Sequence, residues 1–300
     1  ASLPALLYFF AVWIGVDIFA TQHKLRPLDR NARPPLITVF ITASFFLVPF
    51  TTLLAVMYLG YTPQYAAAVA IMAATALLFF NGKLGLQFWV GLTRLCDAVI
   101  TAGNQIAMIA SIILCASIIV GVLGITGLGI KVTSLILSFS GGLIWPALFL
   151  TALACLFLGM EVPTTAAYVI CVSVAGPALI DLGMEPLTVH LFVFWYALLS
   201  TITPPVCGGV FIAAGMVGEN WLRVAITAMS LGIGLYLIPL GMVVHPELLT
   251  VTHTPLTSLI AFGKIAISLS LISHAVISKS LPILRLACFT LGLALLLITL

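Results

Sequence analysis

Two short polar stretches interrupt long apolar runs, and both combine hydroxyl side chains with proline. They are Glu161-Val162-Pro163-Thr164-Thr165 and Ser200-Thr201-Ile202-Thr203-Pro204-Pro205. Adjacent prolines remove two backbone N–H donors and clash with the preceding turn, so a helix must break in the second stretch. Hydroxyl oxygens and the carbonyls freed by a break are ligands that suit a hard cation such as Na⁺. These residue types predict a cation site where the two stretches meet.

The candidate ligands come from these stretches and from the glycine before the first. The candidates for ion and substrate binding are Gly159, Glu161, Pro163, Thr164, Thr165, Ser200, Thr201, Thr203, Pro204 and Pro205. A free carbonyl attracts a cation, whereas a helix N-terminus attracts an anion. The alternative is that both stretches are proline kinks whose hydroxyls bond back to their own helices. Two breaks in neighbouring segments, each with clustered threonines, favour the binding site.

The composition places these stretches in a membrane protein. Hydrophobic residues make up 63% of the 300 residues and charged residues only 6%, and the mean hydropathy is +1.30. A soluble protein needs roughly 25% charged residues. Apolar runs near the crossing length of about 20 residues recur along the chain. We therefore predict an all-α polytopic membrane protein, and the small net charge of +3 gives no support for nucleic-acid binding.

The apolar runs also predict how the chain crosses the membrane. Spans are expected at residues 3–20, 36–59, 65–80, 99–123, 221–244, 255–277 and 282–300. Residues 84–98 are amphipathic and predict a helix in the interface, the alternative being the polar start of the next span. Two arms of about 15 residues flank the first polar stretch and are too short to cross, which predicts a re-entrant hairpin at 141–181. Residues 186–217 then form a discontinuous helix.

The basic residues orient this path. Residues 21–35 hold four of them and are expected to be cytoplasmic. Alternation then places nine of the eleven Lys and Arg residues inside, provided that the hairpin enters and leaves on the outer face. A single crossing by the hairpin would instead put Arg223, Lys279 and Arg285 outside. The positive-inside rule therefore favours the re-entrant hairpin.

A few ionisable residues lie outside the two stretches. Lys264 and His274 fall in a late span, where helix–helix hydrogen bonding or snorkelling is expected. His190 precedes an aromatic run and is expected to anchor the interface and not to relay protons. The six cysteines are scattered singly and are expected to be packing residues.

The motifs resemble those of a known family. Leu158-Gly159-Met160-Glu161-Val162-Pro163-Thr164-Thr165-Ala166-Ala167-Tyr168 is followed by His190-Leu191-Phe192-Val193-Phe194, Thr201-Ile202-Thr203-Pro204-Pro205-Val206 and Ala213-Ala214-Gly215. In this order they resemble the large membrane subunit of tripartite ATP-independent periplasmic (TRAP) transporters, especially the fused small-plus-large permease of the TAXI type. The likeness is strongest over residues 99–244 and extends back to residue 1.

The resemblance implies a sodium-coupled symporter of the bacterial inner membrane that imports small organic anions such as dicarboxylates by an elevator mechanism. An extracytoplasmic solute-binding protein would deliver the substrate, Na⁺ would be the coupling ion, and no enzymatic activity or other cofactor is implied. Pro163-Thr164-Thr165 would form the hairpin tip and Thr203-Pro204-Pro205 the helix break. Gly159, Thr164, Thr165 and Thr203 would then surround sodium. Glu161 departs from the expected small or apolar residue, so it either alters ion coupling or faces water.

The resemblance also implies a division of the chain. Residues 1–20 would end the first repeat half, 21–35 would form a cytoplasmic linker, 36–98 scaffold helices and an interfacial arm helix, 99–244 the transport region of the second half, and 245–300 additional C-terminal helices. The second half of an inverted repeat implies a matching N-terminal half and a small-subunit region as partners, besides membrane lipids.

Two other classes of protein were weighed. A membrane-embedded enzyme needs a catalytic constellation, and the only candidates, Asp181, Glu185 and His190, have no metal-ligand spacing. A channel or non-transporting scaffold subunit is expected to have long uninterrupted helices or a ring-forming filter. The two helix breaks favour a transporter.

Overall fold

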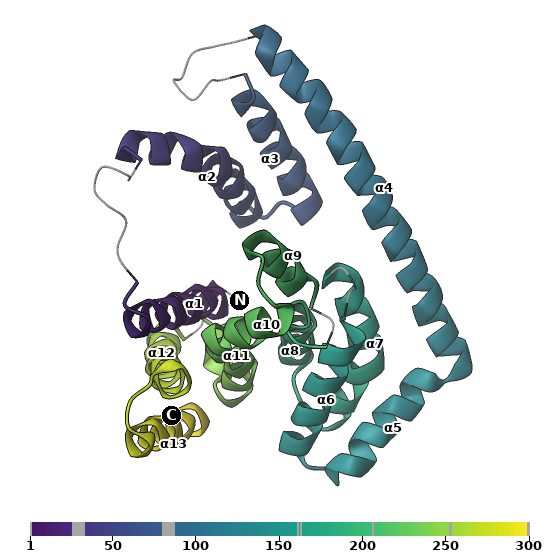
Figure 1. Cartoon of the computed structure of the whole chain (residues 1–300). Coiled ribbons are helices and arrows are strands. Elements are labelled where there is room, and N and C mark those ends of the chain that lie inside the picture. Colours follow the sequence, from purple (N-terminus) through teal and green to yellow (C-terminus); the bar gives the residue numbers. More distant parts are fainter. Residues whose placement is uncertain are drawn as a thin grey trace. The chain divides into compact units, whose positions relative to one another are not determined.

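The computed structural model describes residues 2–25, 34–79, 88–160, 162, 164–205, 207–251 and 254–298. Over these residues the secondary structure is helical, with no strand, which confirms the predicted all-α class (Figure 1). The chain divides into two compact units, one formed by Ala1–Leu25 with Ile112–Leu300 and the other by Arg26–Ser111. Among the described residues, four helices are long and apolar enough to cross a membrane: α1 (Ser2–Gln22), α2 (Leu36–Tyr58), α7 (Thr164–Asp181) and α12 (Pro255–Ile277).

The unit Arg26–Ser111 contains a helix pair and the first part of a long helix. Its elements are α2 (Leu36–Tyr58), α3 (Pro63–Leu77) and the beginning of α4 (Phe88–Thr126). Thr62 caps α3, since its hydroxyl accepts a hydrogen bond from the Tyr65 amide at 3.4 Å. The Arg94 guanidinium donates to the Leu78 carbonyl at 3.4 Å and so ties α4 to the end of α3.

Helix α4 differs from the prediction. The sequence favours an interfacial helix at 84–98 separate from a span at 99–123, whereas the structure has one continuous helix of 39 residues. Residues 84–87 lie outside the described part of the chain. The physical reason is that residues 88–126 contain no proline to stop the helix. At 1.5 Å per residue the helix is about 58 Å long, nearly twice the thickness of the hydrocarbon layer.

The other unit contains the predicted hairpin and discontinuous helix. The hairpin consists of α6 (Ile144–Leu158) and α7 (Thr164–Asp181), and α5 (Leu128–Ser140) packs against α7. The discontinuous helix consists of α8 (Pro186–Leu199) and α9 (Gly208–Val217). Both arms of the hairpin pack against α8. The predicted bounds of these four helices agree with the structure to within two or three residues. The prediction that both hairpin arms are too short to cross is wrong for α7, because further residues at its ends bring it to 18 residues, long and apolar enough to cross a membrane.

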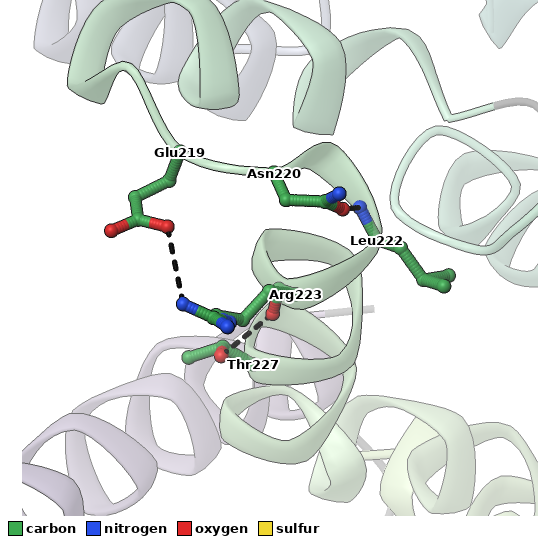
Figure 2. A network of polar contacts seen from close by, with 5 residues as sticks. All are labelled: Glu219, Asn220, Leu222, Arg223 and Thr227. Carbon is green, nitrogen blue, oxygen red and sulfur yellow. Dashed lines mark hydrogen bonds and ion pairs between the residues drawn. The ribbon is translucent and has the colours of Figure 1, made fainter.

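A sharp turn follows α9. The chain bends by 116° into α10 (Trp221–Leu231), and Gly218 makes this possible with a left-handed φ of 67°. Figure 2 shows how α10 begins: the Asn220 side chain accepts from the Leu222 amide at 2.9 Å, and Glu219 and Arg223 form an ion pair at 3.5 Å. Because both charged side chains are exposed, the cap stabilises the turn more than the ion pair does.

The predicted span 221–244 is interrupted. The structure has α10 and then α11 (Ile233–Val244), with Gly232 between them at φ −93° and ψ 15°, outside helical geometry. The Gly232 amide still bonds the Ala228 carbonyl, and its own carbonyl accepts from Leu235. Hydropathy alone does not predict such a break, because the residues on both sides of Gly232 are apolar.

The remaining helices pack around α11. They are α1 (Ser2–Gln22), the short 3-10 helix η2 (Pro246–Leu249), α12 (Pro255–Ile277) and α13 (Pro282–Leu297). Gln22 Nε2 donates to Ser278 Oγ at 3.3 Å, which joins the C-terminal ends of α1 and α12, and α1 also contacts η2 just before α12. These two helices therefore run in the same direction.

Glycines allow α1 to approach its neighbours closely. A Cβ on Gly15 would lie 2.2 Å from the Leu231 carbonyl oxygen, and a Cβ on Gly234 would lie 3.0 Å from Ala11 Cβ. Close backbone approach through small residues is typical of helix packing in membranes, where apolar burial drives little association.

We predict that Gly15→Ala lowers the thermal stability of the protein in detergent, because the new methyl group meets backbone and forces α1 away from α10. Overpacking of this kind costs about 1–3 kcal/mol. Gly263→Ala is the matched control, since Gly263 in α12 has open space where a Cβ would stand. Equal melting temperatures for the two variants would contradict the close α1–α10 contact.

A polar cluster lies at the connection between α11 and α12. His245 is only 1% exposed, and its Nε2 has no hydrogen-bond partner among the described residues. Burial lowers the pKa of His245, and the nearby Lys264 ammonium lowers it further, against the opposing effects of Glu247 and the Leu296 carbonyl. The Lys264 ammonium donates to the Ile298 carbonyl at the end of α13, the helix–helix bond expected from the sequence.

We predict that acid destabilises the protein through His245. The pKa of His245 is lowered in the folded protein, so the unfolded chain binds the proton more readily. The free energy of unfolding is therefore highest above the usual histidine pKa of about 6.5 and decreases as the pH falls below that value. Melting temperatures between about pH 8 and pH 5 should fall less steeply for His245→Gln than for the parent. Parallel curves for the parent and His245→Gln would contradict this role.

Candidate functional site

The second polar stretch meets the end of the first hairpin arm, two residues before the first polar stretch begins. Helix α6 ends at Leu158 and α8 ends at Leu199. The residues that follow these two ends, Gly159 and Ser200, lie against one another. Ser200 Oγ is 2.8 Å from the Gly159 carbonyl and 2.7 Å from the Ala197 carbonyl, and Ser200 is fully buried. The single hydroxyl proton of Ser200 is shared between these two carbonyls. The resulting three-centre hydrogen bond joins the end of the first hairpin arm to the helix break, between residues 41 apart.

Gly159 is required by this close approach. A Cβ there would lie 2.7 Å from Ser200 Oγ and 3.0 Å from the Cys155 carbonyl oxygen. Any larger residue would therefore separate the hairpin from the broken helix. The candidate role of Gly159 is to let its own carbonyl reach the break.

The hydroxyl groups of the second stretch bond back to α8. Thr201 Oγ1 donates to the Leu198 carbonyl at 2.9 Å, and Thr203 Oγ1 donates to the Leu199 carbonyl at 2.7 Å. The sequence predicts these bonds if the stretch is a proline kink whose hydroxyls bond back to their own helix. Each bond uses the hydroxyl proton and leaves lone pairs on the oxygen, so the bonds are compatible with cation binding.

Some backbone carbonyls of the break accept no hydrogen bond from another described residue. These are the carbonyls of Ile202, Pro204 and Pro205, whereas the Thr201 carbonyl accepts from the Gly209 amide at 3.3 Å and the Thr203 carbonyl closes a turn over Pro204 and Pro205. Pro204 and Pro205 have no N–H to donate. The segment is half-buried to exposed and leads into the N-terminus of α9. It therefore combines free carbonyl oxygens, hydroxyl oxygens and a helix N-terminus.

One member of the site was not predicted from the sequence. Tyr236, in α11, places its hydroxyl 2.7 Å from Thr203 Oγ1. Two bonds from α8 hold the same part of α11: Tyr196 OH donates to the Tyr236 carbonyl at 2.7 Å, and Trp195 Nε1 donates to the Leu235 carbonyl at 3.0 Å. A tyrosine within the apolar run 221–244 is the signal that could have identified it.

The hairpin tip contributes less to this geometry. Glu161 and Pro163 lie outside the described residues. Thr164 begins α7 and Thr165 is exposed, and neither hydroxyl forms a hydrogen bond to another described residue. The structure thus brings Gly159 together with Ser200, and Thr203 with Tyr236, while Thr164 and Thr165 stand in the first turn of α7.

His190 has a partner inside the protein. Its Nδ1 lies 2.7 Å from the Tyr168 hydroxyl, and Tyr168 in turn meets Phe194 edge to face, with ring centroids 5.9 Å apart. This bond ties α7 to α8.

Over the described residues, no three His, Cys, Asp or Glu side chains are grouped so that they could hold a metal ion. This includes Asp181, Glu185 and His190, the candidate residues of an enzyme.

These features describe a helical membrane protein whose hairpin and discontinuous helix meet at their breaks, which is the arrangement of many secondary transporters. The family model for the tripartite ATP-independent periplasmic transporter, DctM component, matches residues 1–257. The chain belongs to this family, and the resemblance to the TRAP large permease is confirmed. Comparisons with curated proteins and with solved structures find no match. The family match ends as α12 begins, so α13 lies beyond it.

We predict that Ser200→Ala loosens the hairpin tip. One buried hydrogen bond contributes about 1 kcal/mol, so amide exchange in residues 159–165 should become about fivefold faster. Hydrogen–deuterium exchange with mass spectrometry measures this. Ser173→Ala is the control, because Ser173 Oγ bonds only the Ile170 carbonyl of its own helix. Unchanged exchange at the tip in Ser200→Ala would show that this bond does not hold the two breaks together.

Proposed function

We propose that the protein is the permease of a sodium-coupled, binding-protein-dependent secondary transporter that imports small organic anions such as dicarboxylates. The observation that carries the proposal is the junction of two helix breaks at Gly159 and Ser200 in a chain of the TRAP permease family. Irregular backbone is stable at membrane depth only where protein covers it or where it lines a polar cavity.

The oxygens at the break support sodium as the coupling ion. Thr203 keeps a lone pair after its hydroxyl proton is donated to Leu199, and the carbonyls of Ile202, Pro204 and Pro205 accept no hydrogen bond from another described residue. Hard cations bind such uncharged oxygen ligands in irregular geometry. Thr164 and Thr165, in the first turn of α7, are the further hydroxyl ligands of the proposal.

The charge of the region gives a reason for coupling. Residues 141–217 contain no Lys or Arg, so no cationic side chain in this segment offsets the charge of a carboxylate. Helix N-termini at Thr164 and Gly208 supply only partial positive charge. A bound Na⁺ supplies a full positive charge, so anion and cation bind more tightly together than alone.

The proposal includes the rest of the transport machine. The hairpin and the broken helix belong to the part that moves in an elevator, and residues 36–98 belong to the scaffold. An extracytoplasmic solute-binding protein delivers the substrate, and an N-terminal repeat half with the small-subunit region completes the permease in the bacterial inner membrane.

The test is uptake into proteoliposomes that hold the full-length permease, with its solute-binding protein outside. Radiolabelled succinate and 2-oxoglutarate are the probes, and an inward NaCl gradient is compared with KCl at equal ionic strength. Accumulation that requires Na⁺ is expected. A second measurement, without substrate, compares the melting temperature of the permease in NaCl with that in KCl. Equal melting temperatures in the two salts, together with uptake at the same rate with and without Na⁺, would contradict the proposal.

We predict that Thr203→Val raises the half-saturating sodium concentration. The substitution removes a hydroxyl oxygen at the break, and a polar contact to a charged group is worth about 1.5–3 kcal/mol, so a shift of tenfold or more is expected. Thr165→Val should act in the same direction. Thr227→Val is the control, since Thr227 in α10 bonds only the Arg223 carbonyl. Sodium dependence that survives the double substitution of Thr165 and Thr203 would refute the site.

A further inference from the structure

The contact between Tyr236 and Thr203 has a defined direction. Thr203 Oγ1 lies 2.7 Å from the Leu199 carbonyl and 2.7 Å from the Tyr236 hydroxyl. A carbonyl only accepts, so the single proton of Thr203 is donated to Leu199. The contact at 2.7 Å then requires Tyr236 to donate its own proton to Thr203.

These two bonds leave Thr203 with one unused lone pair. A hydroxyl oxygen has two, and Tyr236 occupies one of them. With its proton and one lone pair fixed by α8 and α11, Thr203 cannot rotate freely, and its remaining lone pair has a single direction. The oxygen is therefore oriented before any ion binds.

Tyr236 is itself held in place. Its backbone carbonyl accepts from the Tyr196 hydroxyl, and the Leu235 carbonyl before it accepts from Trp195 Nε1. On the other side of α11, Gly234 packs tightly, because a Cβ there would lie 3.0 Å from Ala11. The phenol is half-buried between these contacts, so its position relative to the break is fixed by α1 and α8.

We infer that Tyr236 is a positioning residue for sodium: it acts through Thr203, whose free lone pair it directs, and so sets the affinity for the ion. The inference rests on the proposed sodium coupling. It assigns a role to α11, a helix that contains neither of the polar stretches. Partners that orient a ligand oxygen in this way typically change metal affinity by about 10- to 100-fold when they are removed.

Tyr236→Phe and Tyr196→Phe form a matched pair of variants. Each removes one hydroxyl from the α8–α11 contact, but only Tyr236 bonds Thr203, whereas Tyr196 bonds a backbone carbonyl. In proteoliposomes with the full-length permease, NaCl is varied against choline chloride at constant ionic strength. We expect Tyr236→Phe to raise half-saturating sodium about tenfold with little change in maximal uptake. Tyr196→Phe weakens the support of Tyr236 but keeps the hydroxyl that bonds Thr203, so it should raise half-saturating sodium by less than Tyr236→Phe does.

A double-mutant cycle separates positioning from a structural role. If Tyr236 acts through Thr203, then Tyr236→Phe has no further effect on half-saturating sodium in the Thr203→Val background. The sodium-dependent rise in melting temperature gives the same comparison without uptake. If neither uptake nor the melting temperature of the parent protein depends on the sodium concentration, the proposed function is overturned. A sodium-dependent parent with an unchanged Tyr236→Phe variant, or additive effects in the cycle, would overturn this inference alone.

Discussion

Lipid offers no hydrogen-bond partner to a backbone amide or carbonyl, and this constraint governs how the chain can leave helical geometry. The stretch 200–205 breaks a helix that must otherwise cross the membrane, and its two prolines remove donors at the same place. The structure meets the constraint by bringing the end of the hairpin arm to the break. Ser200 bonds the Gly159 carbonyl, and the absence of a side chain on Gly159 makes that distance possible.

The same constraint gives the break its chemistry. Hydroxyl protons at Ser200, Thr201 and Thr203 are used to satisfy carbonyls of their own helix or of the hairpin. Their oxygens keep lone pairs, and the carbonyls of Ile202, Pro204 and Pro205 accept no hydrogen bond from another described residue. Residues 141–217 contain no Lys or Arg, so the break presents oxygen ligands and a helix end without a lysine or arginine from this segment. Such a region is suited to hold a cation and an anion together, and less suited to hold either one alone.

Much of this was predictable because it depends on local residue types. Adjacent prolines fix the break after Leu199, the polar stretch at 159–165 fixes the hairpin, and both follow from the sequence. The family match over residues 1–257 agrees with the motifs that carried the resemblance. The placement of the basic residues favours a hairpin that enters and leaves on the same side of the membrane, which stays a prediction.

Other features depend on contacts that the sequence does not display. The partner of Thr203 is Tyr236, which is 33 residues away in an ordinary apolar run. The break at Gly232 reflects backbone conformation at one glycine among many, and α4 continues through a change from amphipathic to apolar residues because nothing stops it. His190 was expected at the interface, yet the Tyr168 hydroxyl from a neighbouring helix bonds it.

A cryo-EM map of the full-length permease in NaCl shows whether the hairpin and the broken helix meet to line one ion site. We expect Ser200 Oγ within hydrogen-bond distance of the Gly159 carbonyl, and ion density in contact with Thr203 and carbonyls of the break that disappears in choline chloride. A hairpin end separated from the break, or a sodium ion bound elsewhere in the chain, would contradict it.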